Sequence, residues 1–292
     1  MIVASKRERA GYYLFLAPAF IIFTVFIFWP TIESFRLSLF KYSMSSINNA
    51  KFYGLKNYIN LFTNKKFAII MKNTAVYAFF TVPLTISAGL ALALLVHNKL
   101  VKHKNLYRVL YYIPYVSSMV AVATVFKLIF SSGSHGIFNQ LLVKLGMEPL
   151  PLLSDNTWAM AIVILLSIWK EIGYIMIIYL GGLCGISEDI YDAVSLDPIT
   201  PWKKLTKITL PLLKPTTLFL TVTQTIGSFQ VFTPVNVMTG GGPGYATTTI
   251  ISYLYEEGFT GGQMGKASAI SVVIFIILSI LTIIQNKVSE DD

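Results

Sequence analysis

Long uncharged apolar runs alternate with short polar segments along the whole chain. A helix needs roughly 20 apolar residues to cross a bilayer, and six runs reach that length. They cover residues 11–32, 73–96, 108–127 with an extension to about 130, 157–180, 215–238 and 267–286. Because unpaired backbone groups are costly in lipid, such runs cross it as helices. The pattern predicts an all-α membrane protein with six transmembrane helices.

Two of these runs contain features that need an account. The fifth run should end near Met238, because the stretch Gly240 to Gly244 with Pro243 cannot continue a helix. The fourth run contains Lys170 and Glu171. Each charge near the centre of a span costs on the order of 3 kcal/mol, so both should face a bundle interior or a watery cavity. Adjacent helical residues point in different directions, so neither need neutralise the other.

Composition agrees with the apolar pattern. The chain has 292 residues, of which 54% are hydrophobic and 13% charged, and its mean hydropathy is +0.65. The net charge of +9 comes mainly from short segments between the runs. Retention on the cytoplasmic side and contact with anionic membrane lipids explain such a charge, so no nucleic-acid partner is expected. The single cysteine, Cys184, excludes an intramolecular disulfide, and the three histidines show no metal-ligand spacing. No metal site is predicted.

The first run has a competing interpretation as a cleavable signal peptide, because Lys6, Arg7 and Arg9 precede it. Its apolar part is longer than the roughly 7 to 15 residues of a signal core, and no small-x-small site follows. We expect a retained membrane anchor.

Six spans place both termini on one side of the membrane, and Lys and Arg in short loops indicate which side. The proposed cytoplasmic segments carry Lys6, Arg7, Arg9, Lys99, Lys102, Lys104, Arg108, Lys203, Lys204, Lys207, Lys214 and Lys287. The loop 33–72 contradicts a simple count, because it would face outward with Arg36, Lys41, Lys51, Lys56, Lys65, Lys66 and Lys72. The other outward loops hold little beyond Lys144 and Lys266. The count of Lys and Arg residues favours a cytoplasmic N-terminus at 1–11, a transmembrane domain at 12–286 and a cytoplasmic tail at 287–292.

The polar segment 187–211, between the fourth and fifth runs, carries a spaced motif. It holds Asp192-Ala193-Val194, then Asp197-Pro198, then Ile208-Thr209-Leu210-Pro211. This resembles the cytoplasmic coupling loop of ABC importer permeases, which reads Glu-Ala-Ala, three residues, Gly, nine residues, then Ile-x-Leu-Pro. The spacing matches throughout, and three residues deviate. An ordinary amphipathic cytosolic loop is the competing interpretation.

The resemblance implies that this loop forms two short helices that insert into a cleft on a separate ATPase. The first helix should begin near Ser187, with Glu188 and Asp189 placed favourably against the helix dipole. Asp192 stands where the family has Glu and is one methylene shorter. Pro198 replaces the glycine at the bend, so it can make a turn but not one that requires positive φ.

Further segments resemble sugar-type permeases of the maltose and glycerol-phosphate importers. These segments are residues 54–62, residues 107–114, and residues 239–244 with the three threonines 247–249. The last resembles the signature of one of two paralogous subunits, which implies a heterodimer. The resemblance implies a type I importer fold in a prokaryotic cytoplasmic membrane with both termini cytoplasmic. The implied partners are a second permease subunit, two ABC ATPase subunits, an extracellular or periplasmic solute-binding protein and membrane lipids.

The resemblance also suggests a solute path. It places Tyr174 where the maltose-type subunit has a sugar-contacting aromatic residue, and Glu171 lies one turn away. A carboxylate that accepts hydroxyl hydrogens and an aromatic face that stacks on a ring suit a sugar. Alternatively, Lys170 and Glu171 anchor the span to neighbouring helices. On the fifth span a polar stripe could face the pore or pack against helices, and it comprises Thr223, Gln224, Gly227, Ser228 and Gln230.

No ATP site of its own is expected. Gly265-Lys266 is a near miss for an ATP loop, but Thr260 stands where a glycine is needed and Ala267 where Ser or Thr is needed. ATP would therefore bind the partner ATPase, and no cofactor is predicted. Besides a sugar permease, the alternatives are the same machine for glycerol-phosphate or another polar solute, and a polytopic membrane enzyme. An enzyme would need clustered acid or base groups, and only Glu256-Glu257 come close.

Overall fold

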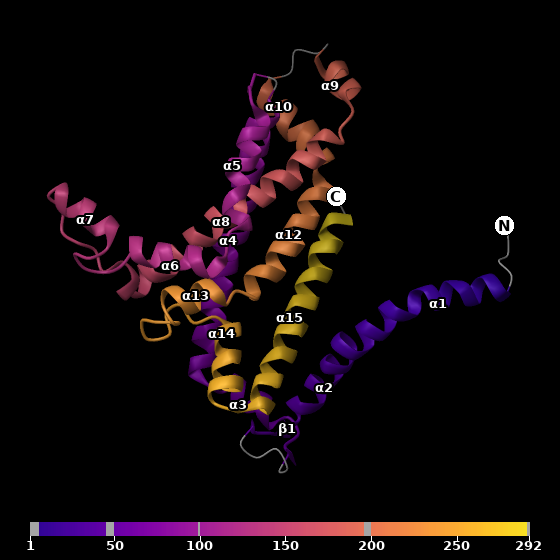
Figure 1. Ribbon diagram of the computed structural model, residues 1–292, viewed down its shortest axis with the longest axis vertical. Coiled ribbons are helices and arrows are strands. Elements are labelled where there is room, and N and C mark those ends of the chain that lie inside the picture. Colours follow the sequence, from indigo (N-terminus) through magenta and orange to yellow (C-terminus); the bar gives the residue numbers. More distant parts are fainter. Residues whose placement is uncertain (1–5, 45–49, 99, 196–199, 291–292) are drawn as a thin grey trace. The chain divides into compact units, whose positions relative to one another are not determined.

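The computed structural model describes residues 6–44, 50–98, 100–195 and 200–290, and side chains within 15–44, 50–98, 100–194 and 200–289. It is mostly helical, as predicted (Figure 1). Short strands β1 (Phe40–Lys41) and β2 (Lys51–Phe52) form an antiparallel pair in which Phe40 lies opposite Phe52. The chain divides into two compact units, residues 1–64 with 254–275 and residues 65–253 with 276–292, which we call unit 1 and unit 2.

Unit 1 begins with one long helical stretch. It is made of α1 (Lys6–Phe23), a π-helical turn (Thr24–Phe28) and α2 (Trp29–Ser38). The helix α3 (Lys56–Phe62), a second π-helical turn (Glu256–Thr260) and the first part of α15 (Met264–Glu290) complete the unit.

Close packing in unit 1 explains the glycine of the ATP-loop near miss. The amide N–H of Gly265 donates to the Tyr42 carbonyl at 3.1 Å. A Cβ at Gly265 would overlap the Phe40 carbonyl oxygen. The glycine therefore serves the approach of two backbones, and no phosphate cradle is needed to explain it.

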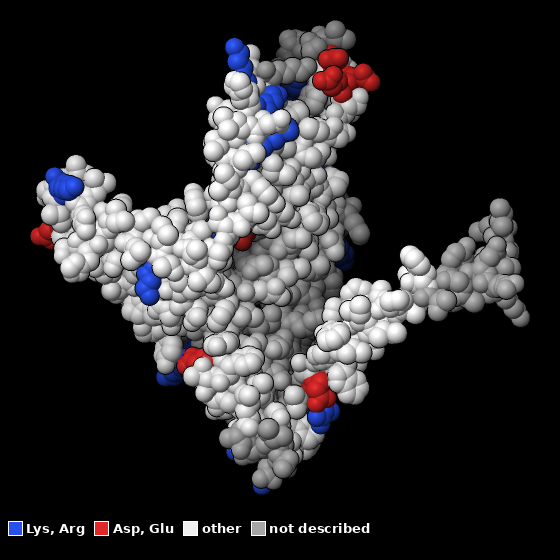
Figure 2. Space-filling model, viewed as in Figure 1, with Lys and Arg blue, Asp and Glu red and all other residues white. Residues whose placement is uncertain are grey.

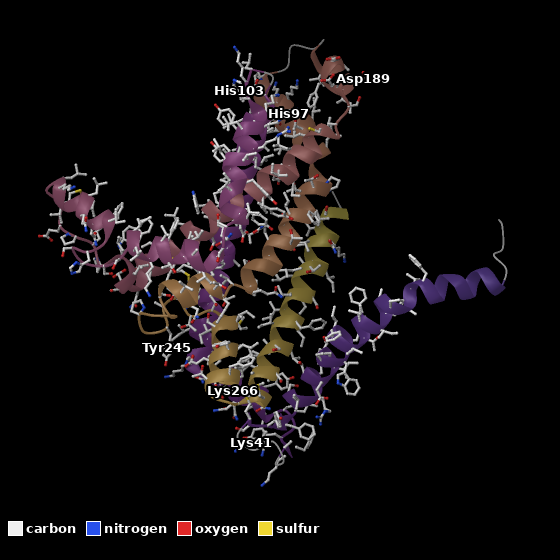
Figure 3. All side chains as sticks on the ribbon, viewed as in Figure 1. Lys41, His97, His103, Asp189, Tyr245 and Lys266 are labelled. Atoms are coloured by element: carbon white, nitrogen blue, oxygen red, sulfur yellow. The ribbon has the colours of Figure 1, made fainter. Side chains whose placement is uncertain are left out.

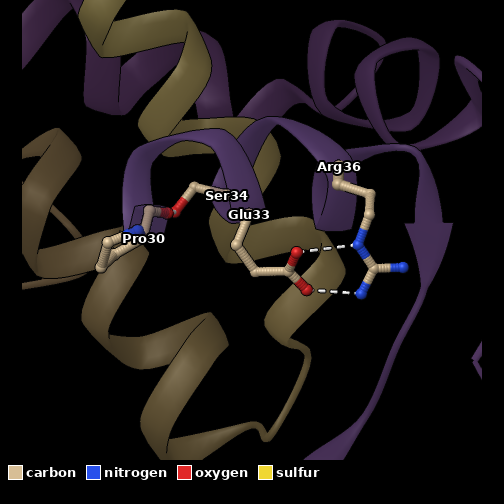
Figure 4. A network of polar contacts seen from close by, with 4 residues as sticks. All are labelled: Pro30, Glu33, Ser34 and Arg36. Carbon is tan, nitrogen blue, oxygen red and sulfur yellow. Dashed lines mark hydrogen bonds and ion pairs between the residues drawn. The ribbon is translucent and has the colours of Figure 1, made fainter. Parts of the chain in front are cut away.

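The end of α2 bears on the charge count of the loop 33–72. The Arg36 guanidinium pairs with the Glu33 carboxylate through two N–H groups, and the Nε to Oε2 distance is 2.8 Å (Figure 4). The Ser34 hydroxyl donates to the Pro30 carbonyl at 2.8 Å. Orientation follows the number of Lys and Arg side chains and not the net charge, so this pair leaves the loop opposed to the proposed topology.

Unit 2 is built on three helices that pack side by side. These are α4 (Lys65–His97), α8 (Asn156–Cys184) and α12 (Lys214–Phe229) (Figure 1). The Asp155 carboxylate caps α8 by accepting from the backbone N–H groups of Thr157 and Trp158, at 2.8 and 3.1 Å. Gly89 of α4 lies so close to the Ile175 side chain that a Cβ would overlap it. Small residues thus let the spans approach closely.

Two apolar clusters form the core of unit 2. One contains Val163 and Leu166 of α8 with Val235 of the short helix α13 (Thr233–Met238). The other contains Tyr179 of α8 with Leu213. Because α8 contributes to both clusters, it is the central helix of the unit.

Four helices in the described part of the chain are long and apolar enough to cross a membrane. They are Phe15–Ser38, Lys65–His97, Asn156–Cys184 and Met264–Ser289. A fifth arises if two bent neighbours, α5 (Lys104–Val116) and α6 (Met119–Ile129), count as one span. The first, second, fourth and sixth predicted runs are therefore helices of spanning length.

The prediction of one uninterrupted helix at 108–130 is wrong. The helices α5 and α6 meet at 91°. Ser117 and Ser118 adopt extended backbone conformations between them, with ψ of 149° and 126°. The last carbonyl groups of a helix lack hydrogen-bond donors within it. At the end of α5, a side chain of α8 supplies the donor, as described below.

The prediction that the fifth helix continues to near Met238 is also corrected. It ends at Phe229, and α13 begins at Thr233 after a break. Pro234 explains the break, because a proline has no N–H for a helical bond and its ring clashes with the carbonyl four residues earlier.

Several shorter helices complete the described chain. They are α7 (Ile137–Lys144), the 3₁₀ turn Leu152–Ser154, α9 (Glu188–Ser195), α10 (Pro201–Lys204), the π-helical turn Leu205–Thr209, α11 (Leu210–Leu212) and α14 (Ile250–Tyr255). Figure 3 places Asp189, His97 and His103 at one end of unit 2 and Tyr245 at the other. The polar segment after α8 and the glycine-rich loop therefore lie at opposite ends of this unit.

Candidate functional site

A cavity of about 310 Å³ lies within unit 2, beside the middle of α8. Its walls come from α4, α6, α8, α12 and the break between α12 and α13. The lining residues are Tyr77, Thr81, Met119, Glu171, Gln224, Gly227, Ser228, Gln230, Val231, Phe232, Thr233 and Pro234. Many of these residues carry hydrogen-bonding groups, so the cavity can bind a polar solute.

Glu171 contributes the carboxylate of this cavity. Its side chain is half-buried and lines the cavity together with the Gln224 side chain of α12. One turn earlier on α8, the Ser167 hydroxyl accepts a hydrogen bond from the Tyr77 hydroxyl at 2.7 Å and donates to the Val163 carbonyl at 3.0 Å. Glu171 therefore belongs to a polar strip that joins α4, α8 and α12 across an otherwise apolar bundle.

The predicted polar stripe of α12 reaches the cavity with one exception. Gln224 and Ser228 are buried in its wall, whereas Gly227 and Gln230 are exposed there. Thr223 does not line it, and its hydroxyl donates to the Phe219 carbonyl at 2.8 Å. The stripe thus faces the cavity through the other four members.

Lys170 faces the bundle interior, as predicted, but its ammonium group does not line the cavity. Nζ donates to the carbonyl oxygens of Pro114, Tyr115 and Ser117 at 3.1, 2.8 and 2.8 Å. Pro114 and Tyr115 lie in the last turn of α5, and Ser117 lies in the break between α5 and α6. This geometry fits the alternative in which Lys170 anchors its span to a neighbouring helix.

Tyr174 also packs against the broken span. Its ring stacks on the Tyr115 ring with the centroids 4.7 Å apart and an interplanar angle of 13°. Gly173, between the two contacts, lies so close to α5 that a Cβ would overlap the Tyr111 carbonyl oxygen. One face of the Tyr174 ring is thus covered by the Tyr115 ring. Tyr174 is not among the residues that line the cavity.

Sequence reasoning missed the α4 contribution to the cavity. Thr74, Tyr77, Thr81 and Thr85 recur at helical spacing within an apolar run, and all four are buried. Such a polar stripe is a readable signal. The hydroxyls of Thr81 and Thr85 have no hydrogen-bond partner within the described chain. Met119 and residues 231–234 gave no such signal, because they reach the cavity through helix breaks.

The segment with the predicted coupling motif forms a second polar surface of unit 2. The Asp189 N–H donates to the Ser187 hydroxyl at 3.3 Å, which places Ser187 at the start of α9 as predicted. Figure 2 shows acidic side chains gathered over α9, with basic side chains near α10 and the start of α5.

The motif residues differ in exposure along this segment. Asp192 and Ala193 are exposed on α9, and Val194 is partly buried. Farther on, Ile208 and Leu210 are partly buried and Pro211 is exposed, whereas Asp197 and Pro198 lie outside the described residues.

Contacts between side chains join α9 to the segment that follows α10. The Lys204 ammonium lies over the Tyr191 ring, 4.5 Å from its centroid. The Tyr191 and Thr209 hydroxyls are 3.4 Å apart. These contacts hold the two halves of the segment together.

The glycine-rich loop at the opposite end of unit 2 is densely hydrogen-bonded. The Thr239 and Thr247 hydroxyls lie 2.7 Å apart, and the Thr248 hydroxyl donates to the Gly241 carbonyl at 2.9 Å. Asn73 of α4 donates to the Tyr245 carbonyl at 2.7 Å. The loop is therefore a firm surface fixed to the start of α4.

Comparison with known proteins decides the family. Residues 82–290 match the family model described as the binding-protein-dependent transport system inner membrane component. The chain belongs to this family. It is a multi-pass membrane protein, and its helices agree with that assignment. The described residues contain no group of three or more His, Cys, Asp or Glu side chains that could hold a metal ion.

Similarity to individual proteins extends over nearly the full chain. The chain is 36% identical over 278 residues to the probable ABC transporter permease protein YurN of Bacillus subtilis, with 94% of each chain covered. It is 33% identical over 295 residues to the lactose transport system permease protein LacF of Rhizobium radiobacter, with 98% of this chain and 97% of LacF covered.

The fold is similar to that of a solved importer. A subunit of a bacterial ABC transporter involved in the import of the acidic polysaccharide alginate matches with a TM-score of 0.84 and 25% identity over 98% of this chain and 96% of that one. The alginate transporter was also solved in complex with an alginate pentasaccharide-bound periplasmic protein, where the TM-score is 0.83 and the identity 25% over 97% and 95% of the chains.

Proposed function

We propose that this permease is the membrane subunit of an ABC importer for a sugar or oligosaccharide, and that the solute passes through the cavity beside Glu171. The observation that carries the proposal is a cavity with carboxylate, amide and hydroxyl side chains inside the spans of a chain of this family. Sugars present many hydroxyl groups, and such side chains both donate to and accept from them. The relative named for lactose and the alginate transporter support a saccharide as the solute.

The proposal includes six spans with both termini in the cytoplasm. The bent pair α5 and α6 would be the third span and α12 the fifth. The segment 187–211 would then be cytoplasmic and would bind one of two ABC ATPase subunits. ATP would be bound by those subunits, and the permease itself would catalyse no reaction.

The proposal also includes a second, paralogous permease and an extracellular or periplasmic solute-binding protein. The complex of the alginate transporter with its periplasmic protein supports the latter. The firm glycine-rich loop, at the end of unit 2 opposite α9, suits contact with such a protein.

Replacing Asp192 and Ala193 together by Lys tests the coupling surface. Both side chains are exposed on α9, so the change should leave the fold and membrane insertion intact. It reverses one charge and adds another where an ATPase would bind, so solute uptake should be lost while the assembled complex still hydrolyses ATP. Uptake in proteoliposomes and ATPase activity would be measured on the same preparation.

Glu148→Lys is a matched control, because Glu148 is exposed outside this segment. This control should retain uptake. If the double variant imports solute as well as the wild type does, α9 is not the coupling surface.

Stimulation of ATPase activity tests the function as a whole. The complex of both permeases and both ATPases should hydrolyse ATP faster when the solute-binding protein is supplied with its sugar than when it is supplied empty. Calorimetry on the binding protein would identify that sugar. Equal rates with the loaded and the empty protein would contradict the importer assignment.

A further inference from the structure

The charge of the cavity comes from one side chain. Among the described residues that line it, Glu171 is the sole one with a formal charge at neutral pH. The remaining polar lining groups are neutral amides and hydroxyls. A solute in this cavity therefore meets one negative charge surrounded by uncharged hydrogen-bonding groups.

The adjacent lysine does not place its ammonium group in the wall of the cavity. Lys170 directs its ammonium group to three carbonyl oxygens of the broken span and is buried there. Lys127 is a basic residue on α6, which also lines the cavity, and its ammonium donates to the Val237 carbonyl at 3.2 Å. Neither lysine is a lining residue.

We infer that this cavity passes uncharged saccharides and excludes anionic ones, with Glu171 as the residue that determines this selectivity. The inference rests on the proposed function, because it assumes that the cavity is the solute path. A carboxylate or phosphate group on a solute would come close to a carboxylate in a site of low dielectric, where like charges repel strongly. Sugar hydroxyls have no such penalty, and they can donate to the same carboxylate.

The sign of the cavity potential can be measured without knowing the solute. Gly227 lines the cavity, and a Cβ at this position would meet nothing within 4 Å, so Gly227→Cys should place a thiol there without strain. Cys184→Ser removes the native thiol. The assembled transporter in nanodiscs would then react with three methanethiosulfonates that carry a trimethylammonium, a sulfonate or a hydroxyl group.

The measured quantity is the rate with the cationic reagent divided by the rate with the anionic one, normalised to the same ratio for a small free thiol. A cleft lined by one sign of charge raises the local concentration of counter-ions, so we expect a normalised ratio of about ten. Glu171→Gln should bring it close to one, and Glu171→Asp should retain it. Glu148→Gln, a neutralisation outside the cavity, should leave it unchanged.

A normalised ratio of one or less would overturn the inference. So would a ratio that Glu171→Gln does not lower, and so would a thiol that reacts with none of the three reagents. ATPase stimulation by the loaded binding protein, measured on the same preparation, separates the two proposals. Stimulation with a ratio of one leaves the importer intact and removes the charge selectivity. A high ratio without stimulation contradicts the importer and the selectivity that depends on it, and leaves only a negatively charged cavity.

Discussion

At the break between α5 and α6, three backbone carbonyl groups accept hydrogen bonds from the ammonium group of Lys170. Hydrogen bonds to charged groups contribute about 1.5 to 3 kcal/mol each, and a buried acceptor left unpaired costs a similar amount. Lys170→Met keeps the apolar stem but removes all three bonds. We expect the Tm of the purified complex to fall by several degrees, with Lys170→Arg falling less because the guanidinium still donates.

Lys127→Met is the matched control for this substitution. Lys127 is exposed and its ammonium donates to one carbonyl, that of Val237. Its replacement should change the Tm little. Equal losses in the two methionine variants would show that Lys170 has no special part in holding the break.

Glu171, which lines the candidate site, could be singled out from the sequence because a carboxylate inside an apolar run is conspicuous. Gln224, Ser228 and the rest of the α12 stripe were readable for the same reason, through their helical spacing. The surroundings of Lys170 and Tyr174 were not readable. Their partners lie on α5, and the sequence does not indicate which carbonyl or ring a side chain on α8 will meet.

At the scale of elements, apolar length located helices of spanning length for four of the six runs. It failed where a helix breaks inside an apolar run. Ser117 and Ser118 are small polar residues that a helix tolerates, and the break also depends on a lysine 53 residues away from Ser117. Pro234 was a readable signal, because a proline within a predicted helix ends or kinks it. The cavity residues Met119 and 231–234 lie at these two helix breaks, so they could not be found from hydropathy.

The packing of α5 against α8 depends on Gly173, and this can be tested. A methyl group there would overlap the Tyr111 carbonyl oxygen, which belongs to a backbone that cannot turn aside as a flexible side chain can. Overpacking of this kind costs typically about 1 to 3 kcal/mol. Gly173→Ala should therefore lower the Tm, measured by thermal unfolding of the complex in detergent.

Gly181 provides the control on the same helix. A Cβ at Gly181 would meet nothing within 4 Å, and alanine has a higher helix propensity than glycine. Gly181→Ala should leave the Tm unchanged or raise it. A loss in Gly181→Ala as large as that in Gly173→Ala would show that the close packing at Gly173 is not the cause of the loss.

At the scale of the whole molecule, the charge count left the orientation in the membrane open, because the loop 33–72 carries seven basic residues. The proposed function requires one answer, since an ATPase can bind the segment 187–211 from the cytoplasm alone. The single cysteine of the chain makes this testable. Cys184 is exposed at the end of α8, three residues before Ser187.

With both termini in the cytoplasm, a membrane-impermeant maleimide should label Cys184 in inside-out vesicles and leave it unlabelled in intact spheroplasts. The expected opposite pattern comes from Met147→Cys in a Cys184→Ser background, because Met147 is exposed in the loop before α8. Mass spectrometry of the chain would detect the maleimide label at either position. Because α8 is one continuous helix between these two positions, they should lie on opposite sides of the membrane. The labelling of one position therefore tests the labelling of the other. Labelling of Cys184 from outside alone would place α9 on the wrong side of the membrane for any ATPase, and the coupling proposal would have to be abandoned.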